Sequence, residues 1–373
     1  MAVVFIIGFV QAFFIGLILL NKKNKSLSDK ILAWWIFFIG LHLLLFYLHY
    51  INYYQNLPYL LGLVVPLPLI HGPFLLLYVS SLTKKEQFFN MLLMIHFLPA
   101  ISYYLLLSPI MFLPAEEKLH YVFEVMPIDP PKYVAIYSFL ISVSGPVYIV
   151  WSLVLLRKHL HSIKKNFSYT EKINLKWLRN LIFGMAIIWL AVLITEFIEE
   201  EIGSAIIFST VTLFVFAIGY YGIRQGVIFT DTSEVYNNSN KENKEKYKKS
   251  PLDIEQSQSL LDRLLIFMED KKPYLETKIT LPQLANQFDT NPNYLSQVIN
   301  EKLHQNFYDF INKYRVEEFK KKLVNEGAMN YTLFGHAQEC GFSSKSSFHE
   351  VFKKQTGQTP SQYQASLLNT TDH

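Results

Sequence analysis

Long apolar runs alternate with short polar connections over the first 225 residues of the chain. Each run approaches the ~17–25 residues that a helix needs to cross a lipid bilayer. The seven runs cover residues 1–20, 31–51, 58–82, 88–112, 133–156, 177–198 and 203–223. The pattern predicts an all-α protein with a seven-helix transmembrane domain over residues 1–224.

The third run, GLVVPLPLIHGPFLL, differs from the others because it contains Pro66, Pro68 and Pro73. Each proline lacks a backbone N–H group and disturbs the helical turn before it. The carbonyl groups freed in this way need protein or water partners at membrane depth. We therefore expect a broken helix here, which lines a cavity together with His71.

Ionisable side chains within a membrane are costly and are commonly functional. Four such residues lie near or within the apolar runs, namely His42, His71, His96 and Glu196. They are candidates for a ligand pocket in the membrane domain. In the alternative interpretation, His42 forms hydrogen bonds across helices and Glu196 lies at the membrane interface.

The chain becomes polar after Arg224. Residues 225–251 are rich in Asn, Lys and Ser and have little apolar surface to bury, which predicts a flexible cytoplasmic linker. From residue 252 onward, apolar residues recur at helical spacing, as in Leu260, Leu261, Leu264, Leu265 and Met268. This pattern predicts a soluble, all-helical domain over residues 252–373.

Helix-start signals divide residues 280–302, approximately, into two short helices. Thr280 and Gln283 form a capping box at the start of the first helix, and Asn291 followed by Pro292 begins the second. The outward face of the second helix carries Asn293, Ser296, Gln297 and Asn300. Two short helices, the second with an amide-rich outer face, are what recognition of the DNA major groove requires.

The same arrangement recurs at about 332–355, after a long amphipathic helix at about 307–324. Gly341 supplies a turn residue between the two helices of this second unit. The outer face of its second helix carries Lys345, Ser346 and His349, followed by Lys353 and Lys354, which are better placed for phosphate contacts. The long helix would hold both recognition helices at a fixed separation. One chain could then contact two successive segments of the major groove.

These stretches resemble the AraC/XylS family of bacterial transcription regulators. The resemblance covers about residues 275–364 and rests on ITLPQLA, NPNYLSQVI, NFYDFINKYRVEEFKKKL and GFSSKSSFHEVFKKQTGQTPSQY. It implies an all-helical domain with two helix-turn-helix units joined by a long helix. It also implies that the recognition helices are residues 292–301 and 345–355.

The sequence departs from the family pattern at three places. Glu350 stands where the family often has a basic residue, and His304 occupies a position that is commonly Gly. The stretch TLFGHA replaces the usual Ile-Ala-containing start of the second unit. These departures bear on the DNA sequence that is recognised rather than on the fold.

Basic residues are distributed unevenly among the connections between the apolar runs. The connections after the first, third and fifth runs, counted together with Arg179 at the start of the sixth run, contain 13 Lys and Arg, whereas those after the second, fourth and sixth contain only Lys118 and Lys132. Because basic connections remain in the cytoplasm, we expect the N-terminus outside and the C-terminal domain inside, in a bacterial inner membrane. The single cysteine, Cys340, excludes an intramolecular disulfide and suits a reducing compartment.

Together these features indicate a membrane-anchored, sequence-specific DNA-binding transcription regulator, a one-component sensor that couples a membrane or external signal to promoter binding. Double-stranded DNA and the lipid bilayer are the expected partners. RNA polymerase, an unknown small-molecule or lipid signal, and a second copy of the chain in a homodimer are further candidates. The sequence shows no catalytic constellation, no metal-spaced His/Cys set and no Gly-rich phosphate loop. We therefore expect no enzymatic activity, no cofactor and no metal.

Two alternatives remain open. In the first, a constitutive DNA-binding tail belongs to a receptor or transporter that signals through a separate membrane partner. In the second, a membrane enzyme or transporter carries a regulatory DNA-binding tail.

Overall fold

The computed structural model describes residues 2–23, 25–83, 91–170, 175–195, 197–225, 253–325 and 332–371. Every regular element in these ranges is helical, which confirms the predicted all-α class. The chain divides into two compact units. The first unit comprises residues 1–159 and 175–226, and the second comprises residues 160–174 and 227–373.

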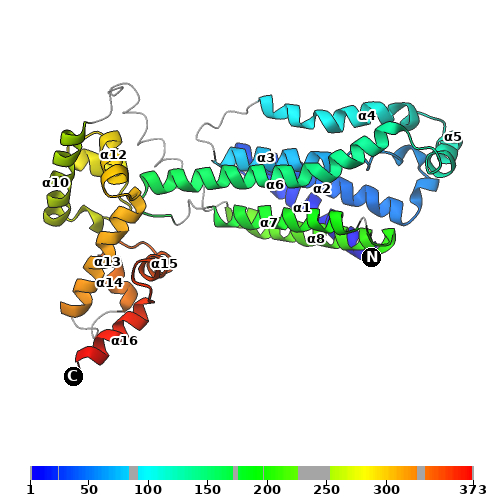
Figure 1. Cartoon of the computed structure of the whole chain (residues 1–373). Helices are drawn as coiled ribbons and strands as arrows, with labels where there is room; N and C mark the ends of the chain where they lie inside the picture. Colours follow the sequence, from blue (N-terminus) through cyan, green and yellow to red (C-terminus); the bar gives the residue numbers. More distant parts are fainter. Residues whose placement is uncertain are drawn as a thin grey trace. The chain divides into compact units, whose positions relative to one another are not determined.

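The first unit contains the apolar helices (Figure 1). Its long helices are α1 (Ala2–Asn21), α2 (Leu27–Tyr50), α3 (Pro68–Thr83), α4 (Leu98–Met111), α6 (Lys132–Asn166), α7 (Lys176–Thr195) and α8 (Glu200–Gln225). The short elements are η1 (Tyr53–Gln55), η2 (Pro58–Leu60), η3 (Met91–Phe97), α5 (Ala115–His120) and the π-helical turn η4 (Tyr121–Val125). The end of α6, from Leu160 on, belongs to the second unit.

Six helical segments among the described residues are long and apolar enough to cross a membrane: Ala2–Asn21, Leu27–Tyr50, Leu92–Met111, Lys132–Asn166, Lys176–Thr195 and Ile202–Tyr221. The third predicted run contributes a shorter apolar helix of 16 residues, α3. It begins only at Pro68, because residues 61–67 form turns around Pro66 and a left-handed Gly62. The helix is therefore shorter than the apolar run that predicted it.

Glycines allow close packing between helices of the first unit. A Cβ atom on Gly72 of α3 would lie 2.2 Å from the Tyr148 ring of α6, and one on Gly145 of α6 would lie 1.9 Å from the Trp189 indole of α7. Elsewhere α1 packs along α2 and α8, and α7 packs along α8. Small residues at helix interfaces are typical of membrane bundles, in which association depends on close van der Waals contact.

The outward faces of this bundle are apolar. Phe14 is 62% exposed, Leu105 67% and Phe139 65%, and many further Leu, Ile, Val and Phe side chains are similarly uncovered. Apolar surface of this extent is unfavourable in water and marks a surface that contacts lipid or another apolar partner. The exposure pattern thus agrees with the apolar runs of the sequence.

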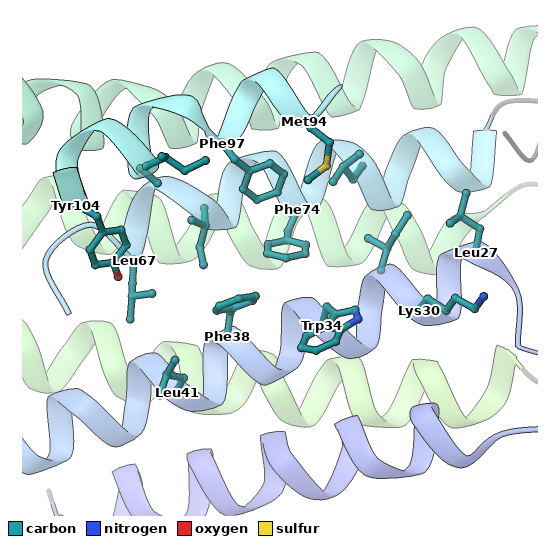
Figure 2. A pocket seen from close by; sticks show the side chains of 15 residues that line it. Leu27, Lys30, Trp34, Phe38, Leu41, Leu67, Phe74, Met94, Phe97 and Tyr104 are labelled. Atoms are coloured by element: carbon teal, nitrogen blue, oxygen red, sulfur yellow. The ribbon is translucent and has the colours of Figure 1, made fainter. Parts of the chain in front are cut away.

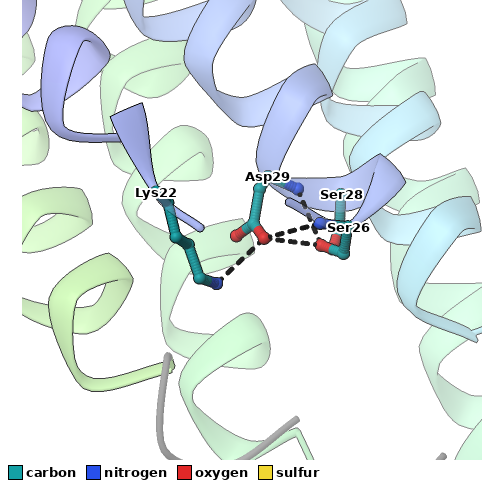
Figure 3. Close-up of polar contacts among 4 residues, drawn as sticks. All are labelled: Lys22, Ser26, Ser28 and Asp29. Carbon is teal, nitrogen blue, oxygen red and sulfur yellow. Dashed lines mark hydrogen bonds and ion pairs between the residues drawn. The ribbon is translucent and has the colours of Figure 1, made fainter. Parts of the chain in front are cut away.

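A polar network closes the short connection between α1 and α2 (Figure 3). Ser26 caps α2, since its hydroxyl accepts a hydrogen bond from the Asp29 backbone N–H while the Asp29 carboxylate accepts one from the Ser26 N–H. Lys22 at the end of α1 pairs with the same carboxylate, with 2.9 Å between Nζ and Oδ2. A capping box and an ion pair therefore fix the start of α2.

The second unit is a set of shorter helices. They are α10 (Ile254–Lys271), η5 (Pro273–Leu275), α11 (Leu281–Gln287), α12 (Pro292–Lys302), α13 (Phe307–Asn325), α14 (Leu333–Glu339), α15 (Lys345–Thr356) and α16 (Pro360–Thr371). Of these, α12, α13 and α15 lie within one residue of the predicted helices, residues 292–301, about 307–324 and 345–355. The predicted linker falls largely on residues 226–252, which lie outside the described residues.

Two hydrophobic cores lie on either side of α13. Phe307, Phe310 and Ile311 from its first turns join a core formed with α10, α11 and α12. Val316 and Phe319 from its later turns join a second core formed with α14, α15 and α16. Because one continuous helix contributes to both cores, it fixes the spacing between the two helix pairs.

Candidate nucleic-acid interface

The first helix pair, α11 and α12, is defined by caps on both helices. The Thr280 hydroxyl and the Gln283 side chain form a reciprocal capping box at the start of α11. The Asn291 side chain caps α12 by accepting a hydrogen bond from the Asn293 N–H at 2.8 Å, and Pro292 occupies the first turn. Leu295 and Val298 are fully buried. The inner face of α12 is therefore anchored in the core.

The outer face of α12 carries the four polar residues that the sequence predicts. Asn293 is exposed, and Ser296, Gln297 and Asn300 are half-buried. Gln297 donates a hydrogen bond to Glu301 at 3.1 Å, and the Asn300 amide donates to the Ser296 carbonyl at 2.6 Å. These intrahelical bonds hold the amides along the helix axis, so base contacts would require the side chains to exchange partners.

The second helix pair, α14 and α15, repeats the arrangement. The Ser344 hydroxyl accepts a hydrogen bond from the Ser347 N–H and caps α15, while Phe348 and Phe352 are completely buried. Gly357 ends α15 in the left-handed conformation, with φ of 77°. As in the first pair, the buried aromatic residues orient the opposite face toward solvent.

That outer face of α15 is polar and basic. Lys345, Ser346 and Lys353 are exposed, and His349 is half-buried with its ring edge against Phe348. Lys354 is also exposed but forms an ion pair with Asp309 at the start of α13, with 2.7 Å between Nζ and Oδ1. The two adjacent lysines thus have different surroundings, which the sequence could not show.

Gly341 lies where the turn of the second pair meets the segment that precedes the first pair. Its φ is 91°, a conformation that L side chains rarely adopt. A Cβ atom at this position would lie 2.5 Å from the Tyr274 carbonyl oxygen and 2.9 Å from Nε of Arg315. Only glycine therefore permits this close approach.

Arg315 joins the two helix pairs from the middle of α13. Its side chain is 1% exposed. The guanidinium donates hydrogen bonds to the carbonyl oxygens of Tyr274, Glu276 and Thr277 at 2.8, 2.7 and 3.3 Å, and it also lies 5.9 Å from the centre of the Phe342 ring. A buried guanidinium is tolerated only when its donors are satisfied. No sequence pattern distinguishes this residue, because a single Arg within an amphipathic helix resembles a solvated surface residue.

A second polar contact ties α13 to η5. Glu318 accepts hydrogen bonds from Lys272 Nζ at 2.9 Å and from the Tyr274 hydroxyl at 3.2 Å. Burial by itself would raise the pKa of Glu318, but the hydrogen bond and charge of Lys272 and the bond from Tyr274 outweigh it, so the pKa is lowered. The Tyr274 pKa is raised by burial and by the neighbouring carboxylate. Glu318 is therefore held as the charged form.

His304 follows α12 with φ of 52°, in the left-handed region. This observation explains why glycine is common at the equivalent position in the family that the sequence resembles, because only glycine adopts that conformation without strain. His304 therefore takes the left-handed conformation at a cost in local backbone strain.

Three of the four predicted pocket residues of the first unit lie among the described residues, and they take part in two separate hydrogen bonds. His42 and His71 stack, and a hydrogen bond of 3.1 Å joins Nδ1 of His42 to Nε2 of His71. His96 instead bonds to the Tyr148 hydroxyl at 2.9 Å. Glu196 lies outside the described residues. The contacts agree with the alternative that His42 bonds across helices.

An apolar cavity of about 690 Å³ lies elsewhere in the first unit, between α2, α3 and the η3–α4 segment. Aromatic side chains surround it, with Phe38, Phe74 and Phe97 around its middle, Lys30 near one end and Tyr104 near the other (Figure 2). His42, His71 and His96 are not among its lining residues. The prediction that His71 lines a cavity is therefore not supported for this one.

The described residues contain no group of three or more His, Cys, Asp or Glu side chains with the arrangement of a metal site. Cys340 is buried in the second core of the C-terminal helices and forms no disulfide. The arrangement in the second unit is thus one for surface recognition, with two capped helices presenting polar and basic side chains from a rigid core.

A match to a known family agrees with this arrangement. A family model described as "Helix-turn-helix domain" matches residues 284–366, which include both helix pairs. A solved structure of a protein of unknown function from Listeria innocua is 28% identical and covers 28% of this chain and 94% of its own, with a TM-score of 0.25. No curated protein matches the chain.

Proposed function

Because residues 284–366 form a helix-turn-helix domain of the AraC type, we propose that the chain is a membrane-anchored transcription regulator that binds promoter DNA in a sequence-specific manner. The observation that carries this proposal is the pair of capped helices, α12 and α15, whose polar faces are held at one spacing by α13. Two recognition helices held at a fixed separation could contact two successive segments of the major groove.

The proposed topology has seven spans, with the N-terminus outside and the C-terminal domain in the bacterial cytoplasm. The basic connections of the sequence support it. The division of the chain into two compact units also supports this topology. Residues 160–174 and the C-terminal helices share one compact unit, although α7 and α8 lie between them in sequence. Two intervening spans would return the chain to the same side of a membrane, which is compatible with this shared unit.

The membrane unit would act as a sensor. The apolar cavity with Lys30 near one end supports an amphiphilic or lipid-phase signal, because an apolar chain would fill the cavity and a polar head could lie near the lysine. In the alternative, the DNA-binding domain is constitutive and a separate membrane partner carries the signal. Stoichiometric co-purification of another membrane protein would favour that alternative.

The function is tested with the full-length chain in lipid nanodiscs. The protein is used to select duplexes from a random pool, and its affinity for the enriched duplex is then measured between 50 and 200 mM salt, as ~6–10 phosphate contacts would lower it ~10³–10⁵-fold over that range. We expect a consensus sequence and a steep salt dependence. Failure to enrich any sequence, together with salt-independent binding, would show that the domain is not a DNA-binding regulator.

A further inference from the structure

The segment that connects α6 to α7 is part of the second unit. Ile163, Phe167, Ser168 and Tyr169 are all buried, with Ile163 and Ser168 only 1% exposed. Ile163, Phe167 and Tyr169 pack together as a small cluster of their own. A connection between two apolar helices would ordinarily be exposed and polar. We call residues 160–170 the docking segment.

The docking segment pairs with the backbone just before the first helix pair. Phe167 and Thr280 form an antiparallel bridge, and both the backbone N–H and the hydroxyl of Ser168 donate to the Ile279 carbonyl, at 3.3 and 2.7 Å. Thr280 is also the residue that caps α11. The segment therefore contacts the chain at the point where the first helix-turn-helix unit begins.

The same serine bonds to two buried polar residues of α13. The Ser168 carbonyl accepts from the Asn312 amide at 3.0 Å and from Nη1 of Arg315 at 3.4 Å, and its hydroxyl accepts from Nη2 of Arg315 at 3.3 Å. Lys164 lies over the Tyr308 ring, 5.8 Å from its centre. Asn312 and Arg315 are each 1% exposed. The docking segment thus supplies partners to the side chain that joins the two helix pairs.

The docking segment leaves the outer faces of the recognition helices uncovered. With the segment in place, Asn293 of α12 and Lys345, Ser346 and Lys353 of α15 remain exposed. Its bonds instead support Arg315, whose other donors hold the segment that precedes α11. Docking is therefore compatible with DNA binding, and it stabilises the joint on which the spacing of α12 and α15 depends.

We propose that the docking segment is an internal regulatory partner of the DNA-binding domain, and that its docking on Ile279, Asn312 and Arg315 favours the DNA-binding arrangement of the two helix pairs. This inference rests on the proposed function. The segment comprises the last turns of α6 and the residues that follow it toward α7, so a signal that shifts α6 acts directly on it. By linkage, undocking weakens DNA binding to the same degree that bound DNA strengthens docking.

Docking is tested by a disulfide cross-link in the full-length chain in nanodiscs. Partners in an antiparallel bridge have Cα atoms ~4.5–5.5 Å apart, within the ~4.4–6.8 Å that a disulfide spans. In a Cys340→Ala background, Phe167→Cys with Thr280→Cys should therefore cross-link on mild oxidation. The matched control is Lys165→Cys with Thr280→Cys, because Lys165 is exposed. Equal cross-linking of both pairs would show that the segment does not dock.

The regulatory step is tested by Ser168→Ala, with Ser162→Ala as the control on the same segment. Removal of the Ser168 hydroxyl should lower DNA affinity about fivefold or more, the lower limit of typical allosteric couplings, whereas Ser162→Ala should not change it. A variant that combines Ser168→Ala with Phe167→Cys and Thr280→Cys should regain the DNA affinity when oxidation forms the disulfide. If Ser168→Ala binds DNA as the unchanged chain does, docking is structural only and the proposal is wrong.

The two hypotheses fail in different ways. The cross-link is read on a gel without DNA, so it decides docking whatever the DNA result. If the unchanged chain shows no salt-dependent DNA binding, the proposed function fails and the regulatory step fails with it. If the unchanged chain binds DNA but the cross-link does not exceed its control, only the inference about the docking segment is overturned.

Discussion

Gln297 lies on the outer face of α12 and His349 on the outer face of α15, and each has a side chain that can bond to base edges. A Gln can contact adenine with two hydrogen bonds, worth ~1–3 kcal/mol of discrimination. Gln297→Ala or His349→Ala should therefore relax the preference at one or two base positions. The slope of affinity against salt should stay nearly unchanged. Selection of random duplexes by each variant measures this, and an unaltered consensus would mean that other residues contact the bases.

Lys353 and Lys354 should differ in their contribution to DNA binding. Lys353 is exposed on α15, whereas Lys354 pairs with Asp309 of α13. Lys353→Ala should weaken binding to all sequences alike and reduce the salt slope by about one phosphate contact. Lys354→Ala should change the slope less, because its charge is already partly neutralised. Salt titrations of the two variants give the comparison. Equal reductions of the salt slope would show that the ion pair between Lys354 and Asp309 dissociates when DNA binds.

Gly341 and Gly357 both have positive φ but differ in their surroundings. A Cβ atom at Gly341 would contact the Tyr274 carbonyl at 2.5 Å, whereas one at Gly357 would meet no atom within 4 Å. Gly341→Ala should cost about 3 kcal/mol or more, since left-handed strain of ~1–2 kcal/mol adds to overpacking of ~1–3 kcal/mol. Gly357→Ala should cost only the strain. Hydrogen exchange of α13 amides in the full chain measures the difference, and similar protection in both variants would contradict the contact.

At the scale of elements, α13 is attached to η5 by the carboxylate of Glu318, whose side chain is 11% exposed. Its lowered pKa means that the stabilisation is present above the ordinary glutamate value and is lost as pH falls through the folded-state pKa. We expect the free energy of opening of the α13 amides to fall by about 1 kcal/mol below pH 4.5. Hydrogen exchange, corrected for intrinsic exchange rates, measures this free energy. Glu318→Gln should remove this pH dependence. If the Glu318→Gln variant loses as much protection at low pH as the unchanged chain does, other carboxylates cause the pH dependence.

The elements themselves differ in how far they could be predicted. The recognition helices α12 and α15 were predicted with nearly correct ends, and α11 with a correct start, because the capping residues Thr280, Asn291 and Ser344 act within one turn of the chain. The third apolar run was predicted too long, because hydropathy continues through residues 61–67 although their backbone forms turns. Apolar composition indicates where a segment is buried or in lipid, but not where its helix begins.

At the scale of the whole molecule, the orientation of the spans can be tested by reporter fusions. Fusions after Leu57, Lys118 and Glu200 should report an external location, and fusions after Lys25, Lys165 and Lys249 an internal one, because basic connections remain inside. Lys165 is the most informative position, since it lies in the docking segment and must share a compartment with the C-terminal domain. An external signal there would contradict both the topology and the docking.

The sequence by itself determined the all-helical class, the apolar helices, and the two helix-turn-helix units with their outward polar faces. These properties depend on periodicity, caps and turn residues, which act over a few positions. Only the tertiary structure decided that Ser168 bonds to Asn312 and Arg315, that Lys354 is paired while Lys353 is exposed, and that the apolar cavity avoids the predicted histidines. Such contacts join residues that are distant in sequence, and no local pattern specifies which buried donor will meet which carbonyl group.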